Sequence, residues 1–319
     1  MNIGFWDNQL SERGSSTAVF DYAYFNQTLL GNKSFIFYEE SNCNNDKQVI
    51  QKFNNHFTVN ACKTFEEVDT YIQKYNIEIL YIIKSGQKDN KLSKIAKNFV
   101  HCIFNCKEPH GDIYASISDV VEEYDYKYPV LPHMINIPDH NENMRKDLNI
   151  PEDAIVFGRY GGKEQFDVHN VQMTVQLIAQ NYPNIYFLFA NTNFSGPKTK
   201  NIILLDKVID LHEKRKFINT CDAMLWARSD GETFGLAIGE FSTCNKPIIA
   251  YFQDGIGSFF HIKTLRHNAY WYKNALELFE IIMKFDKNKV NDWNMYKDYT
   301  PEKVMKIFKE LVIDRLKNT

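Results

Sequence analysis

Two glutamates, Glu232 and Glu240, lie eight residues apart around the segment TFGLAIG. The apolar run AMLWAR before them predicts a buried strand, and a helix is expected to begin near Thr233 or Phe234. Eight helical residues rise about 12 Å, which puts Glu240 roughly two turns deeper than Glu232. Carboxylates accept hydrogen bonds from hydroxyl groups but repel phosphates, which are also negatively charged. The pair therefore suits a ligand with hydroxyls at both ends.

The start of this predicted helix is expected to bind an anion between the two carboxylates. The first N–H groups of a helix have no partner inside it, and the helix dipole adds positive potential there. Gly235 lets an anion approach the backbone closely. The residues of this helix start are Thr233, Phe234, Gly235 and Leu236. A nucleotide sugar fits the pattern, with its diphosphate on the N–H groups, the sugar hydroxyls on Glu232 and the ribose hydroxyls on Glu240.

A simpler interpretation of the same two acids is structural. Glu232 is then a first-turn acid that complements the helix dipole, and Glu240 is a solvated helix residue. The two glutamates taken alone do not separate these interpretations.

Composition limits what kind of protein can carry this motif. The chain has 319 residues, 44% of them hydrophobic, which suffices for a sizeable core and favours two domains. A net charge of −3 gives no reason to expect a nucleic-acid partner. We expect a cytoplasmic protein, because the sequence shows neither a signal peptide nor a transmembrane segment; a peripheral membrane contact and the oligomeric state stay open.

The six cysteines lack a CxxC pair and are expected to be free thiols. One cluster, formed by Cys102, Cys106 and His110, has weak zinc-like spacing. On a strand, however, the two cysteines simply share a face, so we expect structural cysteines and no metal.

Short apolar runs alternate with amphipathic stretches along nearly the whole chain, which predicts an α/β fold with parallel sheets. The predicted strands are NIGFW, SFIFY, HFTVNA, IEILYIIK, HCIFN, IYASIS and PVLPHMI in the first half, and AIVFGRY, IYFLFAN, NIILLDK, AMLWAR and PIIAYF in the second. Among the helices, STAVFDYAYFNQTLL is expected to be capped by Ser15 or Ser16 and to end at Gly31. TPEKVMKIFKELVIDRL predicts a C-terminal helix. Two doubly wound units in tandem account for the pattern.

Several of these segments resemble the retaining GT-B glycosyltransferases of family 4. GETFGLAIGE resembles their E-x7-E signature, which usually reads E-G-F-G-L-x-x-x-E, with Thr233 in place of the first glycine. VLPHMI resembles the family's strand end before the linker, IVFGRYGGKEQFD the loop that opens the donor domain, and KRKFINTCDAML the helix that leads to the signature. The resemblance is specific from about Leu131 to Tyr251.

This resemblance implies two Rossmann-like domains facing across a cleft. Residues 1–145 are then the acceptor-binding domain, residues 146–299 the donor-binding domain, and residues 300–319 a helix packing back on the first domain. The implied activity is retaining transfer of a hexose from a UDP- or GDP-linked sugar to a carbohydrate or glycoconjugate acceptor, without metal or cofactor. Two alternatives are a non-catalytic nucleotide-sugar or glycan-binding module and a nucleotide-sugar epimerase on the same scaffold.

By the same resemblance, Arg159 and Lys163 hold the diphosphate, as two cations in a glycine-rich loop would also do on physical grounds. Lys163 lies slightly earlier than the family's lysine, and surface cations on a turn are the structural alternative. The loop before the KRKF helix contacts the nucleotide base in such enzymes, so Val208, Ile209 and Asp210 are candidates.

In the first half, Arg13 and Gly14 follow the first strand and are expected at the cleft, where the arginine meets the diphosphate or an acidic acceptor. A histidine often lines the reaction centre of this family. His101, His110 and His133 all follow predicted strands, and His110 is preferred because KEPHGD reads most clearly as a loop.

Overall fold

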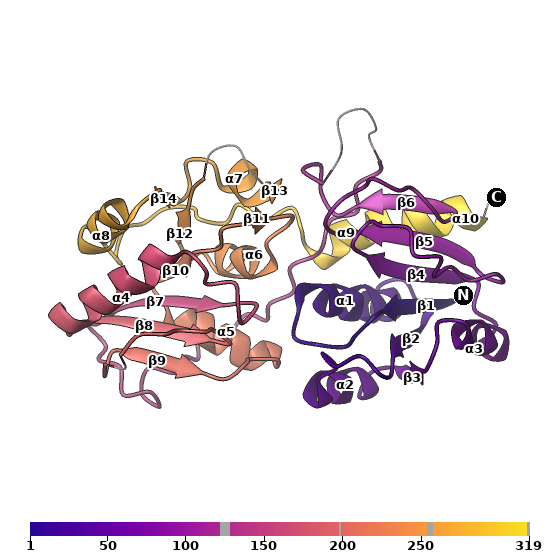
Figure 1. The fold of residues 1–319 in the computed structure, drawn as a ribbon, viewed down its shortest axis with the longest axis horizontal. Coiled ribbons are helices and arrows are strands. Elements are labelled where there is room, and N and C mark those ends of the chain that lie inside the picture. Colours follow the sequence, from indigo (N-terminus) through magenta and orange to yellow (C-terminus); the bar gives the residue numbers. More distant parts are fainter. Residues whose placement is uncertain (122–127, 198, 254–257, 318–319) are drawn as a thin grey trace. The chain divides into compact units, whose positions relative to one another are not determined.

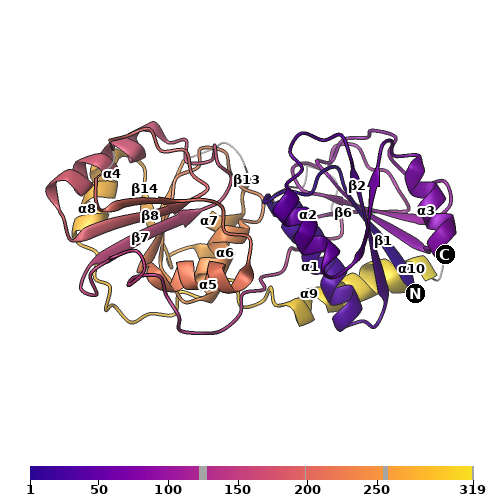
Figure 2. The ribbon, with the colours of Figure 1, turned by 90° about the horizontal axis from the view of Figure 1, so that it is seen from below.

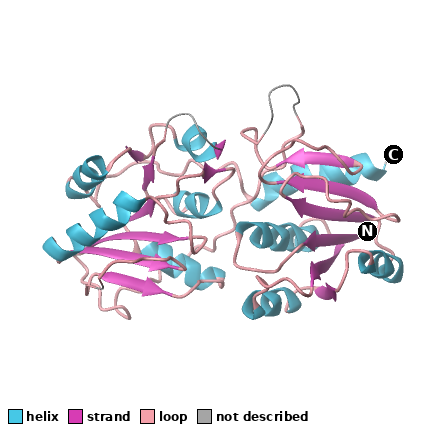
Figure 3. Cartoon of the chain, in the orientation of Figure 1, coloured by secondary structure: helices cyan, strands magenta, loops and turns pink. Residues whose placement is uncertain are grey.

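The computed structural model describes residues 1–121, 128–197, 199–253 and 258–317 (Figure 1). It divides into two compact units, Met1–Met134 with Tyr299–Thr319, and Ile135–Asp298. Each unit contains a six-stranded sheet. Helices accompany both sheets (Figure 3). The predicted α/β fold with two Rossmann-like domains is confirmed. No helix in the described ranges is long and apolar enough to cross a membrane.

The first unit has the strand order β3-β2-β1-β4-β5-β6, with every neighbouring pair parallel. Its strands are β1 (Asn2–Asp7), β2 (Lys33–Glu39), β3 (Thr58–Cys62), β4 (Ile79–Lys84), β5 (Lys97–Cys102) and β6 (Ile113–Ser116). Its helices are α1 (Gly14–Thr28), α2 (Lys47–Asn54), α3 (Glu67–Tyr75), α9 (Pro301–Phe308), the π-helical turn η1 (Lys309–Asp314) and α10 (Arg315–Lys317). All six residues of β4 are buried, as in a parallel sheet covered on both faces.

The second unit has the order β14-β12-β10-β7-β8-β9, again parallel throughout. Its strands are β7 (Ile155–Tyr160), β8 (Ile185–Ala190), β9 (Ile202–Leu205), β10 (Ala223–Trp226), β12 (Ile248–Tyr251) and β14 (Tyr270–Tyr272), with a separate pair β11 (Gly231–Glu232) and β13 (Ser258–Phe259). Its helices are α4 (His169–Asn181), α5 (Leu211–Thr220), α6 (Leu236–Thr243), α7 (Phe260–Leu265) and α8 (Ala275–Met283).

Both sheets share one topology. In each, the first strand of the unit lies beside the fourth, so the strand order reverses between β1 and β4 and between β7 and β10. Open α/β sheets bind ligands outside the carboxyl ends of the strands at this reversal, because the crossover helices diverge to opposite faces there. The residues that end β1, β4, β7 and β10 are therefore where each unit can hold a ligand.

The C-terminal helix returns to the first unit, as predicted (Figure 2). Thr300 caps α9 by accepting a hydrogen bond from the backbone N–H of Lys303, and Pro301 occupies the first turn, where its missing N–H costs nothing. The ring of Phe308 lies 5.5 Å from that of Tyr22 in α1.

One predicted strand is wrong, and one observed strand was not predicted. PVLPHMI forms no strand; only Val130 makes a bridge, to Ser116, because Pro129 and Pro132 have no N–H to donate to a ladder. β14, which completes the second sheet, was not predicted, since three aromatic residues give no periodic signal.

The expected serine cap of α1 is also wrong. The helix begins at Gly14, so both serines fall inside its first turn, and its N-cap residue, Arg13, makes no side-chain capping bond. Ser16 is buried instead, and its Oγ donates to Asp7 Oδ2 at 2.8 Å. This bond joins the carboxyl end of β1 to α1. The helix ends at Thr28, before Gly31.

Burial raises the pKa of Asp7 from 3.8 to about 6, against the opposing effect of the Ser16 hydroxyl. Between these values the folded chain holds a proton that the unfolded chain has lost, so folding stability falls as pH rises through this window. Asp7→Asn removes the titration. We expect the stability of the wild type relative to this variant to fall by about 2 kcal/mol between pH 4 and 7.

Urea unfolding at several pH values, followed by circular dichroism, measures this difference. Glu12→Gln, which changes an exposed acid on the neighbouring loop, is the control and is expected to follow the wild type. Parallel pH profiles for Asp7→Asn and the wild type would show that Asp7 does not titrate in this range.

Candidate functional site

The second unit brings the signature segment to the carboxyl ends of β7 and β10. β10 ends at Trp226, and the chain passes through β11 into α6, which begins at Leu236 rather than near Thr233 or Phe234. The later start is due to Gly235, whose φ of 83° and ψ of 62° place it in the left-handed region. A side chain would strain this turn, so glycine is required.

Phe234 and Gly239 fix how α6 packs. The ring of Phe234 is buried and stacks on Phe260 at 5.3 Å, and its carbonyl accepts from the hydroxyl of Tyr296 at 2.8 Å. A Cβ at Gly239 would lie 2.6 Å from Ile135 and 2.7 Å from the ring of Tyr296. The second glycine therefore allows two segments to pack directly on the helix. Thr233 and Leu236 are half-buried at its start.

Glu232 lies in a cluster of donors. Its Oε1 accepts from Trp226 Nε1 at 3.1 Å, and its Oε2 pairs with Arg228 at 3.2 Å. Burial raises the pKa of Glu232, while Arg228, Trp226 and Arg159 act to lower it. Each carboxylate oxygen retains a lone pair for a hydroxyl group. Glu232 is thus held in place rather than free on a helix surface.

Arg159 is the last residue but one of β7 and is 3% exposed. Its guanidinium donates to the carbonyl of Gly162 at 2.9 Å and to the hydroxyl of Thr192, and it stacks over the ring of Phe166. Burial lowers the pKa of Arg159 to about 10, and nearby Glu232 opposes this effect, so the side chain is charged at neutral pH. The structure therefore places a fixed cation close to Glu232.

Glu240 is 4% exposed, so the interpretation of this residue as a solvated helix position is wrong. Its Oε2 accepts from the hydroxyl of Tyr160 at 2.6 Å, and its Oε1 pairs with Lys214 at 2.8 Å. Tyr160 comes from β7 and Lys214 from α5. A buried carboxylate needs such partners, because desolvation of an unpaired charge is expensive.

The remaining predicted donor residues lie in loops of this unit. Lys163 is exposed and belongs to the loop after β7. Ile209 and Val208 are half-buried in the loop before α5. Asp210 caps this helix by accepting from the N–H of Glu213 at 3.0 Å, so it has a structural role there.

In the first unit, His110 does not stand alone. Lys84, which ends β4, has its ammonium 3.1 Å from His110 Nε2 and pairs with Asp89, while His110 Nδ1 donates to the carbonyl of Glu108 at 2.6 Å. Burial, followed by the charge of Lys84, lowers the pKa of His110 despite the Glu108 carbonyl. This hydrogen bonding matches a neutral ring whose Nε2 accepts from Lys84.

The other first-unit candidates divide into exposed and buried positions. Arg13 and Gly14 are exposed at the start of α1, beside the carboxyl end of β1. His101 is fully buried, with Nδ1 2.5 Å from the hydroxyl of Tyr81 and Nε2 2.8 Å from the carbonyl of Leu131. Burial lowers its pKa to about 3, so His101 is a neutral core residue.

The sequence analysis did not identify the residues that form hydrogen bonds or ion pairs with the predicted site residues. Arg228 is four residues before Glu232 and was visible as a charged neighbour in ARSDGE. Tyr160, Lys214 and Lys84 had no comparable signal, because each meets its partner across 26 residues or more of sequence.

No family model matches the chain, and no curated protein matches its sequence. Solved structures do resemble its fold. Anabaena HepE (Alr3699) in complex with UDP-glucose has a TM-score of 0.71 and 12% identity over all of both chains. A glycosyltransferase from Rickettsia africae ESF-5 has a TM-score of 0.69 and 14% identity over 98% of each chain.

A putative UDP-N-acetylglucosamine 2-epimerase from Listeria monocytogenes is also similar, with a TM-score of 0.62, 9% identity, and coverage of 100% of this chain and 97% of that one. The structural neighbours thus include glycosyltransferases of the GT-B fold and an epimerase on the same scaffold. At these identities the likeness concerns the fold, which is GT-B.

Tyr160→Phe tests whether the buried Glu240 depends on its partners. Loss of the hydroxyl leaves Oε2 one hydrogen bond short in the interior, so we expect the free energy of unfolding to fall by about 1–3 kcal/mol. Tyr186→Phe, on β8 of the same unit, is the matched control, because the Tyr186 hydroxyl has no hydrogen bond among the described residues. Denaturant unfolding compares the two variants, and equal losses in both would contradict a special role for Tyr160.

Proposed function

We propose that the chain is a retaining glycosyltransferase that moves a hexose-type sugar from a nucleoside-diphosphate sugar to a carbohydrate or glycoconjugate acceptor. One observation carries the proposal. Both signature glutamates are held by hydrogen-bond donors, Glu232 in β11 and Glu240 in α6, at the strand-order reversal of the second sheet. This is the position at which a Rossmann-like unit binds a nucleotide.

The donor diphosphate is proposed to bind at the start of α6. The first bond into the helix runs from Gly239 N to Gly235 O at 2.9 Å, so the N–H groups of Leu236, Ala237 and Ile238 have no partner inside the helix. These groups suit an anion, and the left-handed Gly235 lets it come close. Arg159 supplies a buried charge nearby, and the exposed Lys163 is able to reach the phosphates from the neighbouring loop.

The two carboxylates are proposed to accept hydrogen bonds from hydroxyl groups on either side of the diphosphate. Glu232 accepts from the donor sugar and Glu240 from the ribose, each through the lone pairs that its protein partners leave. Ile209, in the loop before α5, faces the base. A uridine donor is favoured over a guanosine donor because the similar HepE structure was solved with UDP-glucose.

Catalysis is proposed to be electrostatic and independent of metal. Arg159, Lys163 and the N–H groups of α6 stabilise the negative charge that grows on the leaving diphosphate, and they are in place before the reaction. The acceptor hydroxyl then attacks the anomeric carbon on the face from which the phosphate departs and gives its proton to the leaving phosphate oxygen. The bond between the anomeric carbon and the phosphate breaks, and the anomeric configuration is retained. The reaction needs no covalent intermediate on a protein side chain.

The acceptor is proposed to bind to the first unit, and the donor to the second. Arg13, Gly14 and His110 lie at or near carboxyl ends of the first sheet, where the acceptor would enter. His110 accepts from Lys84 through Nε2, so we assign it to positioning the acceptor rather than to removing a proton.

Calorimetric titration with UDP, GDP and ADP without added metal tests the donor site. We expect UDP to bind the wild type and to bind Glu240→Gln more weakly by about 1–3 kcal/mol, as for a lost charged hydrogen bond. Glutamine is preferred to alanine because alanine would leave Lys214 and Tyr160 buried without their acceptor. Glu280→Gln, on the exposed face of α8, is the control. Failure of every diphosphate to bind would remove the basis of the proposal.

Turnover separates a transferase from its alternatives. NMR of UDP-glucose with a set of acceptors is expected to show UDP and glycosylated product forming in equal amounts with the donor's anomeric configuration. Arg159→Met should lower kcat by about a hundredfold or more, because it removes a preorganised charge, while Lys284→Met on the surface should not. Epimerised donor without transfer would favour the epimerase, and donor binding without any turnover would favour a binding module.

A further inference from the structure

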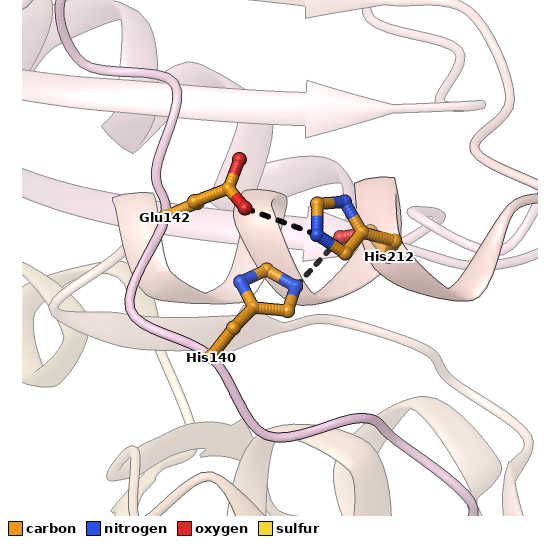
Figure 4. A group of neighbouring side chains, drawn as sticks. All are labelled: His140, Glu142 and His212. Atoms are coloured by element: carbon orange, nitrogen blue, oxygen red, sulfur yellow. Dashed lines mark hydrogen bonds and ion pairs between the residues drawn. The ribbon is translucent and has the colours of Figure 1, made fainter.

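A histidine–carboxylate cluster lies on the second unit and contains none of the residues assigned to donor chemistry. Among the described residues, His140, Glu142 and His212 form the one group of three metal-ligand side chains whose ligand atoms all lie within 4.8 Å of one another. Figure 4 shows the first two on the extended segment before β7 and the third at the start of α5. The two imidazole rings stack with their centroids 4.0 Å apart.

The hydrogen bonding of His140 leaves one ring nitrogen available. Its Nε2 lies 3.2 Å from the backbone carbonyl of His212, which can only accept, so Nε2 carries the proton. The lone pair of a neutral ring is then on Nδ1, which is buried and has no hydrogen-bond partner among the described residues. A ligating histidine commonly donates its other N–H to a backbone carbonyl in this way.

His212 and Glu142 already face each other. Nε2 of His212 is 3.1 Å from Oε1 of Glu142, a separation close to the roughly 3.4 Å between two ligand atoms of a tetrahedral zinc ion with bonds of about 2.1 Å. The other ring nitrogen, Nδ1, lies 3.9 Å from a carboxylate oxygen of Glu213, which favours a proton on Nδ1. An ion can therefore replace the proton between Nε2 and Glu142.

The backbone that carries two of these ligands is held on α5 independently of any ion. Asn219 Nδ2 donates to the carbonyls of His140 and Glu142 at 2.7 and 2.8 Å, and Arg215 also donates to the carbonyl of His140. Lys216 pairs with Oε2 of Glu142 at 3.2 Å and leaves Oε1 toward His212. Because these contacts already hold the ligating residues in place, the residues lose little conformational freedom when an ion binds, which favours a specific site.

We propose that His140, Glu142 and His212 bind one divalent transition-metal ion of the zinc type. Two imidazole nitrogens and one carboxylate oxygen suit such an ion better than Mg²⁺ or Ca²⁺, which prefer oxygen ligands. Water completes the tetrahedron, since Glu142 and His212 are exposed. The ion would join the segment before β7 to the start of α5, next to the loop that contains Ile209. It is a structural clamp that takes no part in the transfer reaction.

The test is Zn²⁺ titration of the untagged full chain in competition with a chromophoric chelator. We expect one Zn²⁺ per chain, binding at least about tenfold more weakly to His140→Ala and to His212→Ala. His169→Ala, an exposed histidine on α4 of the same unit, is the control and should bind like the wild type. Thermal unfolding should show a Zn²⁺-dependent rise in Tm for the wild type and control only.

Glu142→Gln, which preserves shape, covers the case in which an alanine variant does not fold, and it should also bind Zn²⁺ at least about tenfold more weakly. Visible absorption of bound Co²⁺ reports whether the coordination is tetrahedral. Unchanged Zn²⁺ affinity in the folded variants, or no Zn²⁺ bound by the wild type, would overturn the proposal. None of these readouts depends on sugar transfer.

Discussion

The buried carboxylate of Glu240 is the interaction on which the arrangement of the second unit depends. It joins β7, α5 and α6, because Tyr160, Lys214 and Glu240 come from these three elements. Removing a carboxylate from water costs several kcal/mol unless charge and hydrogen bonds replace the lost hydration. The bonds from Tyr160 and Lys214 offset that cost and orient α6, whose N-terminus is the proposed diphosphate site.

Two glycines give α6 its position relative to the sheet. Gly235 provides the left-handed turn before the helix, and Gly239 lets Ile135 and Tyr296 pack against the helix backbone. The side chains around the turn are then committed to packing, as Phe234 is with Phe260. The first-turn N–H groups of α6 and the two carboxylates are polar groups that suit a ligand rich in phosphate and hydroxyl groups.

The two units use their strand-order reversals in different ways. In the second unit, Arg159 is a buried cation beside Glu232. In the first unit, Asp7 is buried at the end of β1 and hydrogen-bonded to Ser16, and Lys84 at the end of β4 pairs with His110 and Asp89. Lys84 ends β4 and His110 lies in the loop between β5 and β6, so the folding of this loop brings together two residues that are 26 apart in sequence.

The sequence by itself determined the α/β class, most of the strands, the C-terminal helix and the signature segment, because each of these rests on local periodicity, capping or spacing. The tertiary structure decided what the glutamates touch. Glu240 meets Tyr160 across 80 residues, and such contacts follow from strand order and helix packing rather than from any local pattern. It also decided that Ser16 binds Asp7 instead of capping α1. The buried carboxyl group of Asp7 needs a hydrogen-bond donor, and its burial is not visible in the sequence.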